Sequence, residues 1–209
     1  MVNAIERHVG VGHAIERLSA ESRVRCTFGC ESDSERETTK SDAQEIPTMH
    51  VSVVGSGYIG TTIAAWFAEL GHEVTNVDID ADVVAAVNNG EAPIHEPGLD
   101  ELMATYGGDT LVATTDYDEI AASDVTFLAL PTPSKADGSI DLSAMEAAAE
   151  SLGEVIAEKD DDHLVVVKST VIPGTTAETI APIIEDASGK SVGEGFRIAM
   201  NPEFLREGF

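Results

Sequence analysis

The sequence predicts an α/β fold, a doubly wound and mostly parallel sheet with helices on both faces. Two observations lead to this prediction. From Met49 onward, short stretches rich in Val and Ile alternate with longer stretches of helical periodicity. The short stretches are apolar along most of their length, as strands are when helices cover both faces of their sheet.

The predicted elements follow from these patterns in order. The first strand is 50–54, and 58–70 is a helix that Gly71 ends, with an apolar side formed by Ile59, Ile63, Trp66, Phe67 and Leu70. Further strands are expected at 73–78, 111–115, 124–130, 163–170 and 196–200, and further helices at 80–90, 143–159 and 175–188.

The charge of the chain limits its partners. There are 12 basic and 38 acidic residues, a net charge of -26, and only five lysines. Such a surface repels nucleic acid and anionic lipid, so neither nucleic acid nor a membrane is expected as a partner. The chain is either a generic acidic protein or, as we favour, a halophilic protein whose self-repulsion concentrated salt screens.

Sequence composition also bears on location and metals. The stretch 47–68, which contains no charged residue, is too rich in Gly, Ser and Thr to span a membrane, and no signal peptide precedes it. We therefore expect a cytoplasmic protein. The two cysteines, Cys26 and Cys30, have no nearby Cys or His pair to complete a metal site, so no metal is expected.

The first 48 residues differ from the rest. Residues 1–48 hold six of the 12 basic residues and end in a polar stretch that can bury little surface. We expect 1–48 to be a disordered extension outside the core. An upstream start-site error, with Met49 as the natural first residue, is one hypothesis for it. Residues 49–209 are expected to form the α/β domain.

The stretch "GSGYIG" lies between the first strand and the first helix. Gly55, Gly57 and Gly60 form a G-x-G-x-x-G pattern in the strand–turn–helix context that dinucleotide binding requires. The helix N-terminus would offer N–H groups to a pyrophosphate. Tyr58 and Ile59, between the glycines, are assigned to the same cofactor site. The domain is therefore predicted to be a Rossmann-type dinucleotide-binding domain.

Asp78 indicates which dinucleotide is bound. It ends the second predicted strand, 18 residues after Gly60. A carboxylate there accepts hydrogen bonds from the ribose hydroxyls and repels a 2′-phosphate. NAD is therefore predicted as the cofactor, in preference to NADP.

Three polar stretches follow later strands: "LPTP" at 130–133, "KST" at 168–170 and "NPEFLREG" at 201–208. The carboxyl ends of parallel strands lie at one edge of a sheet, where such folds bind ligands. We expect their hydroxyls and carboxylates to lie together there; these groups belong to Thr132, Thr170, Glu203 and Glu207.

These stretches resemble the UDP-glucose/GDP-mannose dehydrogenase family of NAD-dependent enzymes, which oxidise nucleotide sugars to uronic acids. The similarity covers "GSGYIG", "NVDID", "NNGEAPIHEPGL", "LPTP", "DGSIDLS", "KSTVIPGTT" and "NPEFLREG", in family order. With its acidic bias, the chain most resembles the haloarchaeal UDP-glucose 6-dehydrogenases, which supply glucuronic acid for surface-protein N-glycosylation.

The resemblance implies two hydride transfers to NAD, with a cysteine thiolate capturing the intermediate aldehyde. It implies that Thr170 and Glu203 hold a catalytic water and assist proton transfer, and that Thr132 and Thr170 contact the cofactor. It places Glu207 near substrate and nicotinamide, and the sugar-nucleotide site at Glu203, Phe204, Leu205, Arg206 and Glu207. The full-length family enzyme is expected to be a homodimer or a higher homo-oligomer.

The sequence also departs from the family pattern. Phe209 stands where a small residue is usual, and Val83 where some members have a lysine near the cofactor ribose. The catalytic cysteine belongs to a second half that family members have after this turn. We therefore expect a fragment, produced by a frameshift or an artificial truncation, that cannot complete the oxidation alone. The alternatives are a dehydrogenase of GDP-mannose or of a UDP-N-acetyl sugar, and a non-catalytic NAD-binding fragment.

Overall fold

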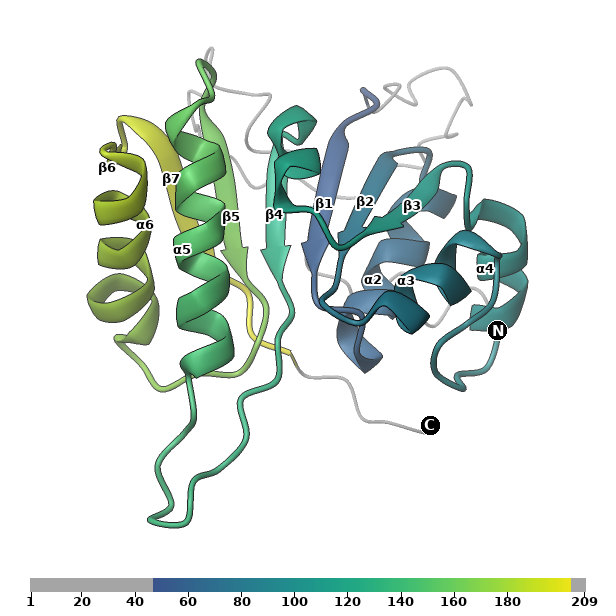
Figure 1. Cartoon of the computed structure of the whole chain (residues 1–209), viewed down its shortest axis with the longest axis horizontal. Helices are drawn as coiled ribbons and strands as arrows, with labels where there is room; N and C mark the ends of the chain where they lie inside the picture. Colours follow the sequence, from purple (N-terminus) through teal and green to yellow (C-terminus); the bar gives the residue numbers. More distant parts are fainter. Residues whose placement is uncertain (1–46, 204–209) are drawn as a thin grey trace, which may run out of the picture. The chain divides into compact units, whose positions relative to one another are not determined.

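A computed structural model describes residues 47–203. In this part the strands form one seven-stranded sheet in the order β3-β2-β1-β4-β5-β7-β6, and every adjacent pair is parallel (Figure 1). The predicted doubly wound parallel sheet is therefore confirmed. The strands are β1 (His50–Val54), β2 (Glu73–Val77), β3 (Leu111–Thr114), β4 (Val125–Leu128), β5 (His163–Val167), β6 (Ser191–Val192) and β7 (Gly195–Met200).

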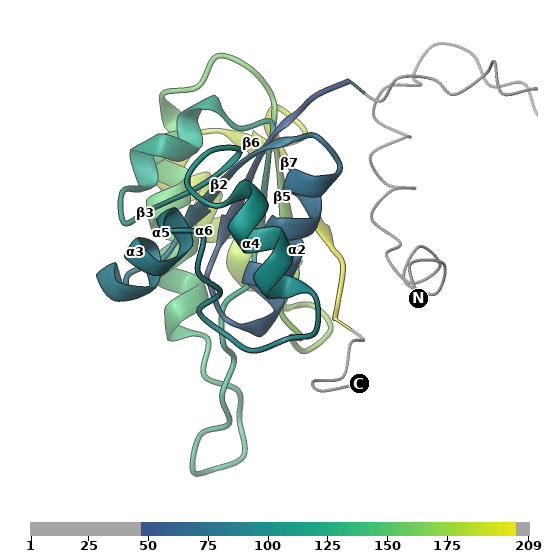
Figure 2. The same cartoon turned by 90° about the vertical axis from the view of Figure 1, so that its right-hand side faces the viewer.

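Helices cover both faces of the sheet. Figure 2 shows α2 and α4 on one side of it and α5 and α6 on the other. The helical elements are α2 (Tyr58–Glu69), α3 (Ala81–Asn88), α4 (Leu99–Tyr106), the 3-10 helix η2 (Tyr117–Ala122), α5 (Ser143–Ala157), the π-helical turn η3 (Thr176–Ile180) and α6 (Ala181–Ser188).

The buried side of α2 differs from the predicted one. Ile63 and Phe67 are buried as expected, but Leu70 is 64% exposed. Small residues, among them Gly60 and Ala64, complete the buried side, and a Cβ on Gly60 would overlap the carbonyl oxygen of Gly55. The prediction for Leu70 was wrong, since it assumed that bulky residues alone mark the packed side.

The other face has a core formed by α5 and the strands beneath it. Met145, Leu152 and Ile156 are fully buried there, together with Phe196 of β7. The alternating residues of β5 that join this cluster are Val165 and Val167. Burial of these side chains fixes the register of the strands, and therefore the relative positions of the strand ends at the edge of the sheet.

Several elements differ from the predictions. β4 and β5 end earlier than expected, so residues 129–130 and 168–170 lie in loops at the carboxyl edge. The helix predicted at 175–188 begins with the π-helical turn η3. The helices α4 and η2 and the strand β6 were not predicted, since they are short and their patterns bury few residues.

Two further predictions concern residues 1–48 and membrane-spanning helices. The disordered extension predicted for 1–48 falls almost entirely outside the described residues. Within 47–203, none of the helices has the length and apolar character needed to cross a membrane.

Candidate functional site

The direction in which the chain leaves the strands changes at the centre of the sheet. β1 and β4 are neighbours, and the chain leaves β1 towards α2 on one face but leaves β4 towards α5 on the other (Figures 1 and 2). Connections that diverge in this way open a crevice at the carboxyl ends of the strands, where open α/β sheets bind their ligands. Most predicted site residues lie at this edge.

The three glycines of the first turn have different environments. Gly55 has a φ of 100°, and a Cβ there would lie 2.6 Å from the carbonyl oxygen of Ala129. A Cβ on Gly60 would lie 1.8 Å from the carbonyl oxygen of Gly55, whereas a Cβ on Gly57 would contact nothing within 4 Å. The fold itself therefore requires Gly55 and Gly60, and Gly57 leaves open space at the N-terminus of α2.

A buried polar network holds this turn in shape. Asn76 of β2 donates from Nδ2 to the carbonyl oxygen of Val53 at 2.9 Å, and its Oδ1 accepts from Ser56 Oγ at 2.7 Å. Thr61 Oγ1 donates to the carbonyl oxygen of Ser56 at 2.8 Å. The turn is therefore preorganised. Asn76 and Thr61 were not predicted, although an amide within an apolar strand was a usable signal for Asn76.

Asp78 lies where the cofactor prediction requires a carboxylate. It follows β2 directly, and its two oxygens accept from the backbone N–H groups of Ser56 at 2.6 Å and Asp80 at 3.0 Å. These bonds fix the carboxylate beside the glycine turn. Burial, and secondarily the negative charge of Asp78, raises the pKa of Tyr117 on η2. Tyr117 therefore stays neutral beside Asp78; the sequence analysis did not identify it.

The N-terminus of α2, like that of α6, has no acidic residue in its first turn. The cap of α2, Gly57, has no side chain. The first turns of α3, α4 and α5 all contain acidic residues, namely Asp82, Asp100, Glu101 and Glu146. The positive end of the α2 dipole is therefore not neutralised by its own side chains, which suits it to phosphate.

Hydrogen bonds join the loops that follow β4 and β5. Ser169 Oγ donates to the carbonyl oxygen of Leu130 at 2.6 Å, and Thr132 Oγ1 donates to the carbonyl oxygen of Thr170 at 3.1 Å. The structure thus brings the predicted residues Thr132 and Thr170 together. Beyond this contact, residues 131–142 form an arm that projects from the carboxyl edge (Figure 1).

The loop after β7 joins the same edge through an ion pair. Lys168 Nζ lies 2.7 Å from Glu203 Oε2, and the two side chains are 8% and 13% exposed. Glu203 was predicted, but Lys168 was not. A lysine directly after the apolar stretch "VVV", in a chain with five lysines, was a signal for it. The other predicted residues of this turn, Phe204, Leu205, Arg206 and Glu207, lie outside the described part.

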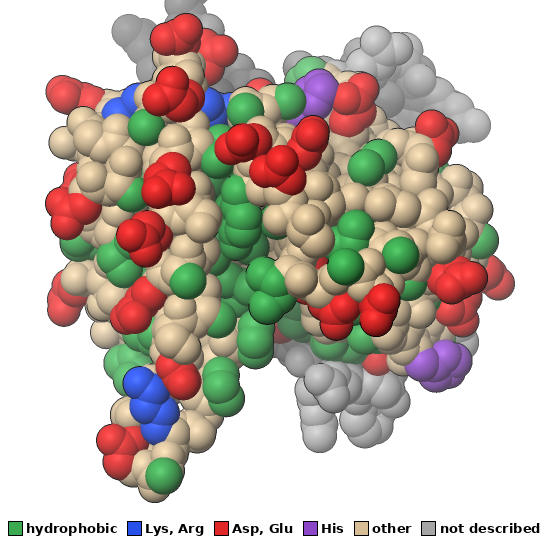
Figure 3. Space-filling view, viewed as in Figure 1, with side chains coloured by type: hydrophobic (Ala, Val, Ile, Leu, Met, Phe, Trp, Pro, Cys, Tyr) green, Lys and Arg blue, Asp and Glu red, His purple; other side chains and the backbone are tan. Residues whose placement is uncertain are grey.

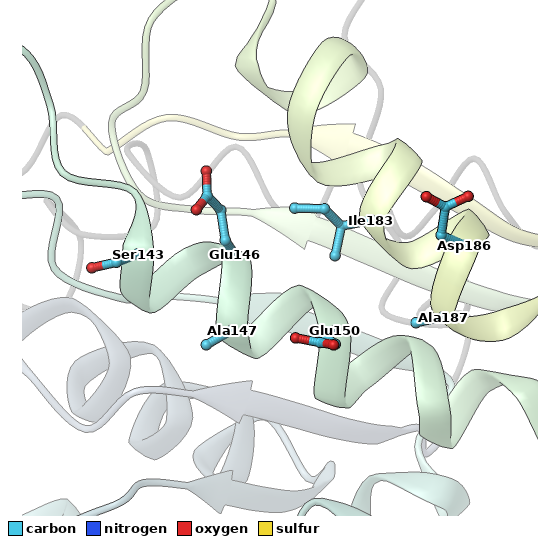
Figure 4. Close-up of a pocket in the computed structure, with 7 residues that line it drawn as sticks. All are labelled: Ser143, Glu146, Ala147, Glu150, Ile183, Asp186 and Ala187. Carbon is cyan, nitrogen blue, oxygen red and sulfur yellow. The ribbon is translucent and has the colours of Figure 1, made fainter.

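A surface depression between α5 and α6 is a poor candidate for the cofactor. It has a volume of about 550 Å³ and is lined by the carboxylates of Glu146, Glu150 and Asp186 (Figure 4). Acidic side chains like these are spread over the visible face (Figure 3), and a phosphate would be repelled here. Within 47–203, no group of three or more His, Cys, Asp or Glu residues is placed to hold a metal.

Known proteins are similar to this chain over most of its length. The chain is 70% identical over 160 residues to the UDP-glucose 6-dehydrogenase AglM of Haloferax volcanii, covering 77% of this chain and 37% of the relative. It is 43% identical over 162 residues to the GDP-mannose 6-dehydrogenase of Pseudomonas aeruginosa, again covering 37% of that protein. The chain thus spans little more than a third of the length of these relatives.

Solved structures show the same fold. A ternary complex of GDP-mannose dehydrogenase from Pseudomonas aeruginosa matches with a TM-score of 0.74 at 43% identity, over 76% of this chain and 37% of that one. A UDP-glucose dehydrogenase from Pyrobaculum islandicum matches with a TM-score of 0.72 at 42% identity, over 78% and 37%. Residues 49–209 match the NAD binding domain of the UDP-glucose/GDP-mannose dehydrogenase family, and the chain belongs to that family.

Proposed function

We propose that this chain is the NAD-binding portion of a UDP-glucose 6-dehydrogenase, which oxidises UDP-glucose to UDP-glucuronate for the synthesis of surface glycans. The observation that supports the proposal best is the carboxyl edge itself. The glycine turn with Asp78 and the paired Lys168 and Glu203 follow strands of the same edge, on the two sides of the central crevice.

The described residues fit an NAD molecule. Gly57 and the N-terminus of α2, without acidic residues, would hold the pyrophosphate, and Asp78 would accept from the ribose hydroxyls. Bound NAD would supply the acceptor for the hydride that leaves C6 of the sugar. The fixed carboxylate of Asp78 would repel the 2′-phosphate of NADP.

The loops after β5 and β7 would serve the chemistry. Thr170 and Glu203 would hold a water molecule beside the reacting carbon, and an ionised Glu203 would accept a proton from it. Thr132 donates a hydrogen bond to the Thr170 carbonyl oxygen and would thereby position the loop after β5 against the cofactor. The thiolate that the family uses to capture the aldehyde would come from the part of the enzyme that this chain does not span.

Other features of the whole enzyme are proposed on the same resemblance. They are a cytoplasmic location, a homo-oligomeric state and a halophilic character, which the net charge of -26 supports. A GDP-mannose 6-dehydrogenase is the second candidate, because relatives with that name are 43% identical to this chain. The identity of 70% to the Haloferax volcanii relative favours UDP-glucose.

Two chimeras test the substrate. In each, residues 49–209 replace the matching segment of a full-length relative, either the Haloferax volcanii or the Pseudomonas aeruginosa enzyme. NADH formation is then followed with UDP-glucose and with GDP-mannose. We expect oxidation of UDP-glucose by the first chimera and weak or no activity in the second. Efficient oxidation of GDP-mannose by the second alone would support the other candidate, and NAD binding without activity in either would indicate a non-catalytic module.

A further inference from the structure

The ends of β5 and β7 bring one lysine and one glutamate together. Val167 and Met200, the last residues of these strands, are partners in the parallel register, and Asn201 N donates to the Val167 carbonyl oxygen at 3.0 Å. Lys168 and the turn that contains Glu203 therefore leave the sheet side by side. The backbone N–H of Lys168 also donates to Leu128 on β4, so the main chain of the lysine is fixed from two sides.

This ion pair differs from the others in the described residues. The Nζ–Oε2 distance of Lys168 and Glu203 is 2.7 Å, and both side chains are mostly buried. The pair of Lys135 and Asp141 is 3.7 Å long, with side chains that are 51% and 36% exposed. An exposed pair contributes little and is easily screened, whereas a buried pair determines the charge of both of its members.

Without a cation, a carboxylate in this position would tend to be protonated. Burial disfavours its ionised form, and the net charge of -26 adds a negative field that acts in the same direction. An ammonium group 2.7 Å away opposes both effects. Because replacing a buried ion pair by apolar residues is often neutral for stability, control of the charge of Glu203 explains Lys168 better than stabilisation does.

We propose that Lys168 is a positioning residue that keeps Glu203 ionised and holds its carboxylate at the carboxyl edge of the sheet. The inference rests on the proposed function, in which Glu203 accepts a proton from a water molecule. Only the ionised carboxylate can do so. Lys168 acts through Glu203 and does not itself touch the reacting atoms.

The titration of Glu203 tests the proposal in the 209-residue chain itself. The carboxyl carbons of glutamate are labelled with ¹³C, the chain is kept in concentrated KCl, and the Glu203 signal is assigned as the one lost in Glu203→Gln. In the unaltered chain, Glu203 is expected to titrate at a lower pH than the exposed glutamates. A Glu203 signal that titrates above them would overturn the proposal without any further variant.

Substitutions give the second measurement. Lys168→Met is expected to raise the titration midpoint of Glu203 by about one to three pH units, and Lys168→Arg is expected to leave it low. Lys159→Met is the matched control. It removes an equal charge at the opposite edge, where Lys159 donates to the carbonyl groups of Ala121 and Ser123, and it should not move the midpoint. An unchanged midpoint in folded Lys168→Met, or an equal shift in the control, would contradict the proposal.

Titration of the same proteins with NAD+ separates this inference from the proposed function. If the unaltered chain binds NAD+ but Lys168→Met leaves the Glu203 midpoint unchanged, the inference fails and the cofactor assignment stands. If the midpoint moves as expected but no NAD+ binds, the charge control is correct and the proposed function fails. Should Lys168→Met not fold, the low midpoint in the unaltered chain and in Lys168→Arg remains the deciding observation.

Discussion

Gly57 and Gly60 belong to one motif but have different physical roles. A Cβ on Gly60 would overlap the Gly55 carbonyl oxygen, whereas one on Gly57 would point into open space. Gly57 also has a φ of -71° and a ψ of -171°, a conformation that any residue can adopt. The fold therefore requires Gly60 but does not require a glycine at position 57, and we propose that Gly57 leaves space for the cofactor.

Two substitutions separate these roles. Gly57→Val should lower the free energy of unfolding by about 1 kcal/mol at most, because valine is a poorer N-cap than glycine. It should weaken NAD+ binding at least about tenfold, because the side chain fills the space needed by the pyrophosphate. Gly60→Ala should lower the free energy of unfolding by about 2 kcal/mol or more. Denaturant unfolding and calorimetric titration measure both effects, and loss of stability without loss of affinity in Gly57→Val would contradict the assignment.

The carboxylate of Asp78 is expected to set the preference for NAD+ over NADP+. Asp78→Asn should weaken NAD+ binding and narrow the preference for NAD+ over NADP+, because the repulsion of the 2′-phosphate disappears. An amide can still accept one of the two backbone bonds, from Ser56 and Asp80, that hold the turn. Affinities for both cofactors are compared in the same salt. An unchanged ratio of affinities would show that Asp78 does not contact the ribose.

At the scale of elements, a buried polar chain joins the middle strands away from the crevice. Ser52 of β1 and Thr126 of β4 have hydroxyl oxygens 2.6 Å apart, and Thr126 Oγ1 is 2.7 Å from Nε2 of His163 on β5. His163 Nδ1 is 3.0 Å from the carbonyl oxygen of Ser123, to which it donates. Nε2 then accepts from Thr126, so this arrangement suits the neutral ring.

The hydrogen-bonded network around His163 makes the free energy of unfolding depend on pH. Burial, and secondarily the charge of Lys159, lowers the pKa of His163 to about 4, from 6.5 when unfolded. Between these values the unfolded chain binds a proton that the folded chain does not, so folding weakens as pH falls from about 6.5 to about 4. The loss attributable to His163 is about 3 kcal/mol.

The many carboxylates also titrate in this range, so the comparison uses His163→Gln. The free energy of unfolding is measured from pH 7 downward in both proteins. The unaltered chain should lose more stability than the variant over this window. Parallel curves would show that folding does not lower the pKa of His163.

Sequence patterns predicted most of these helices and strands but not all of them. Apolar stretches and glycine breaks predicted six of the strands and four of the helices to within a few residues. The patterns did not reveal α4, in which only Leu99 and Met103 are buried, although α3 was predicted with Val87 alone buried. Nor could they reveal that Lys168 and Glu203 meet, because that contact depends on the register of β5 and β7, which no local pattern encodes.

For the molecule as a whole, the large negative charge opposes folding. A net charge of -26 on 209 residues destabilises the compact state through self-repulsion. Raising KCl from about 0.1 M to about 1 M shortens the screening length from about 10 Å to about 3 Å. The midpoint of thermal unfolding should therefore rise steeply over this range and more slowly above it. A midpoint that does not depend on salt would contradict the halophilic interpretation.

We propose that NAD binds at the carboxyl edge of the sheet, between β1 and β4. Calorimetric titration of the chain in concentrated KCl with NAD+, with NADP+ as the control cofactor and Gly57→Val as the control protein, tests it most directly. We expect saturable binding of NAD+, much weaker binding of NADP+, and little binding of NAD+ to the folded variant. Equal binding of both cofactors, or no binding of NAD+ to a folded chain, would contradict it.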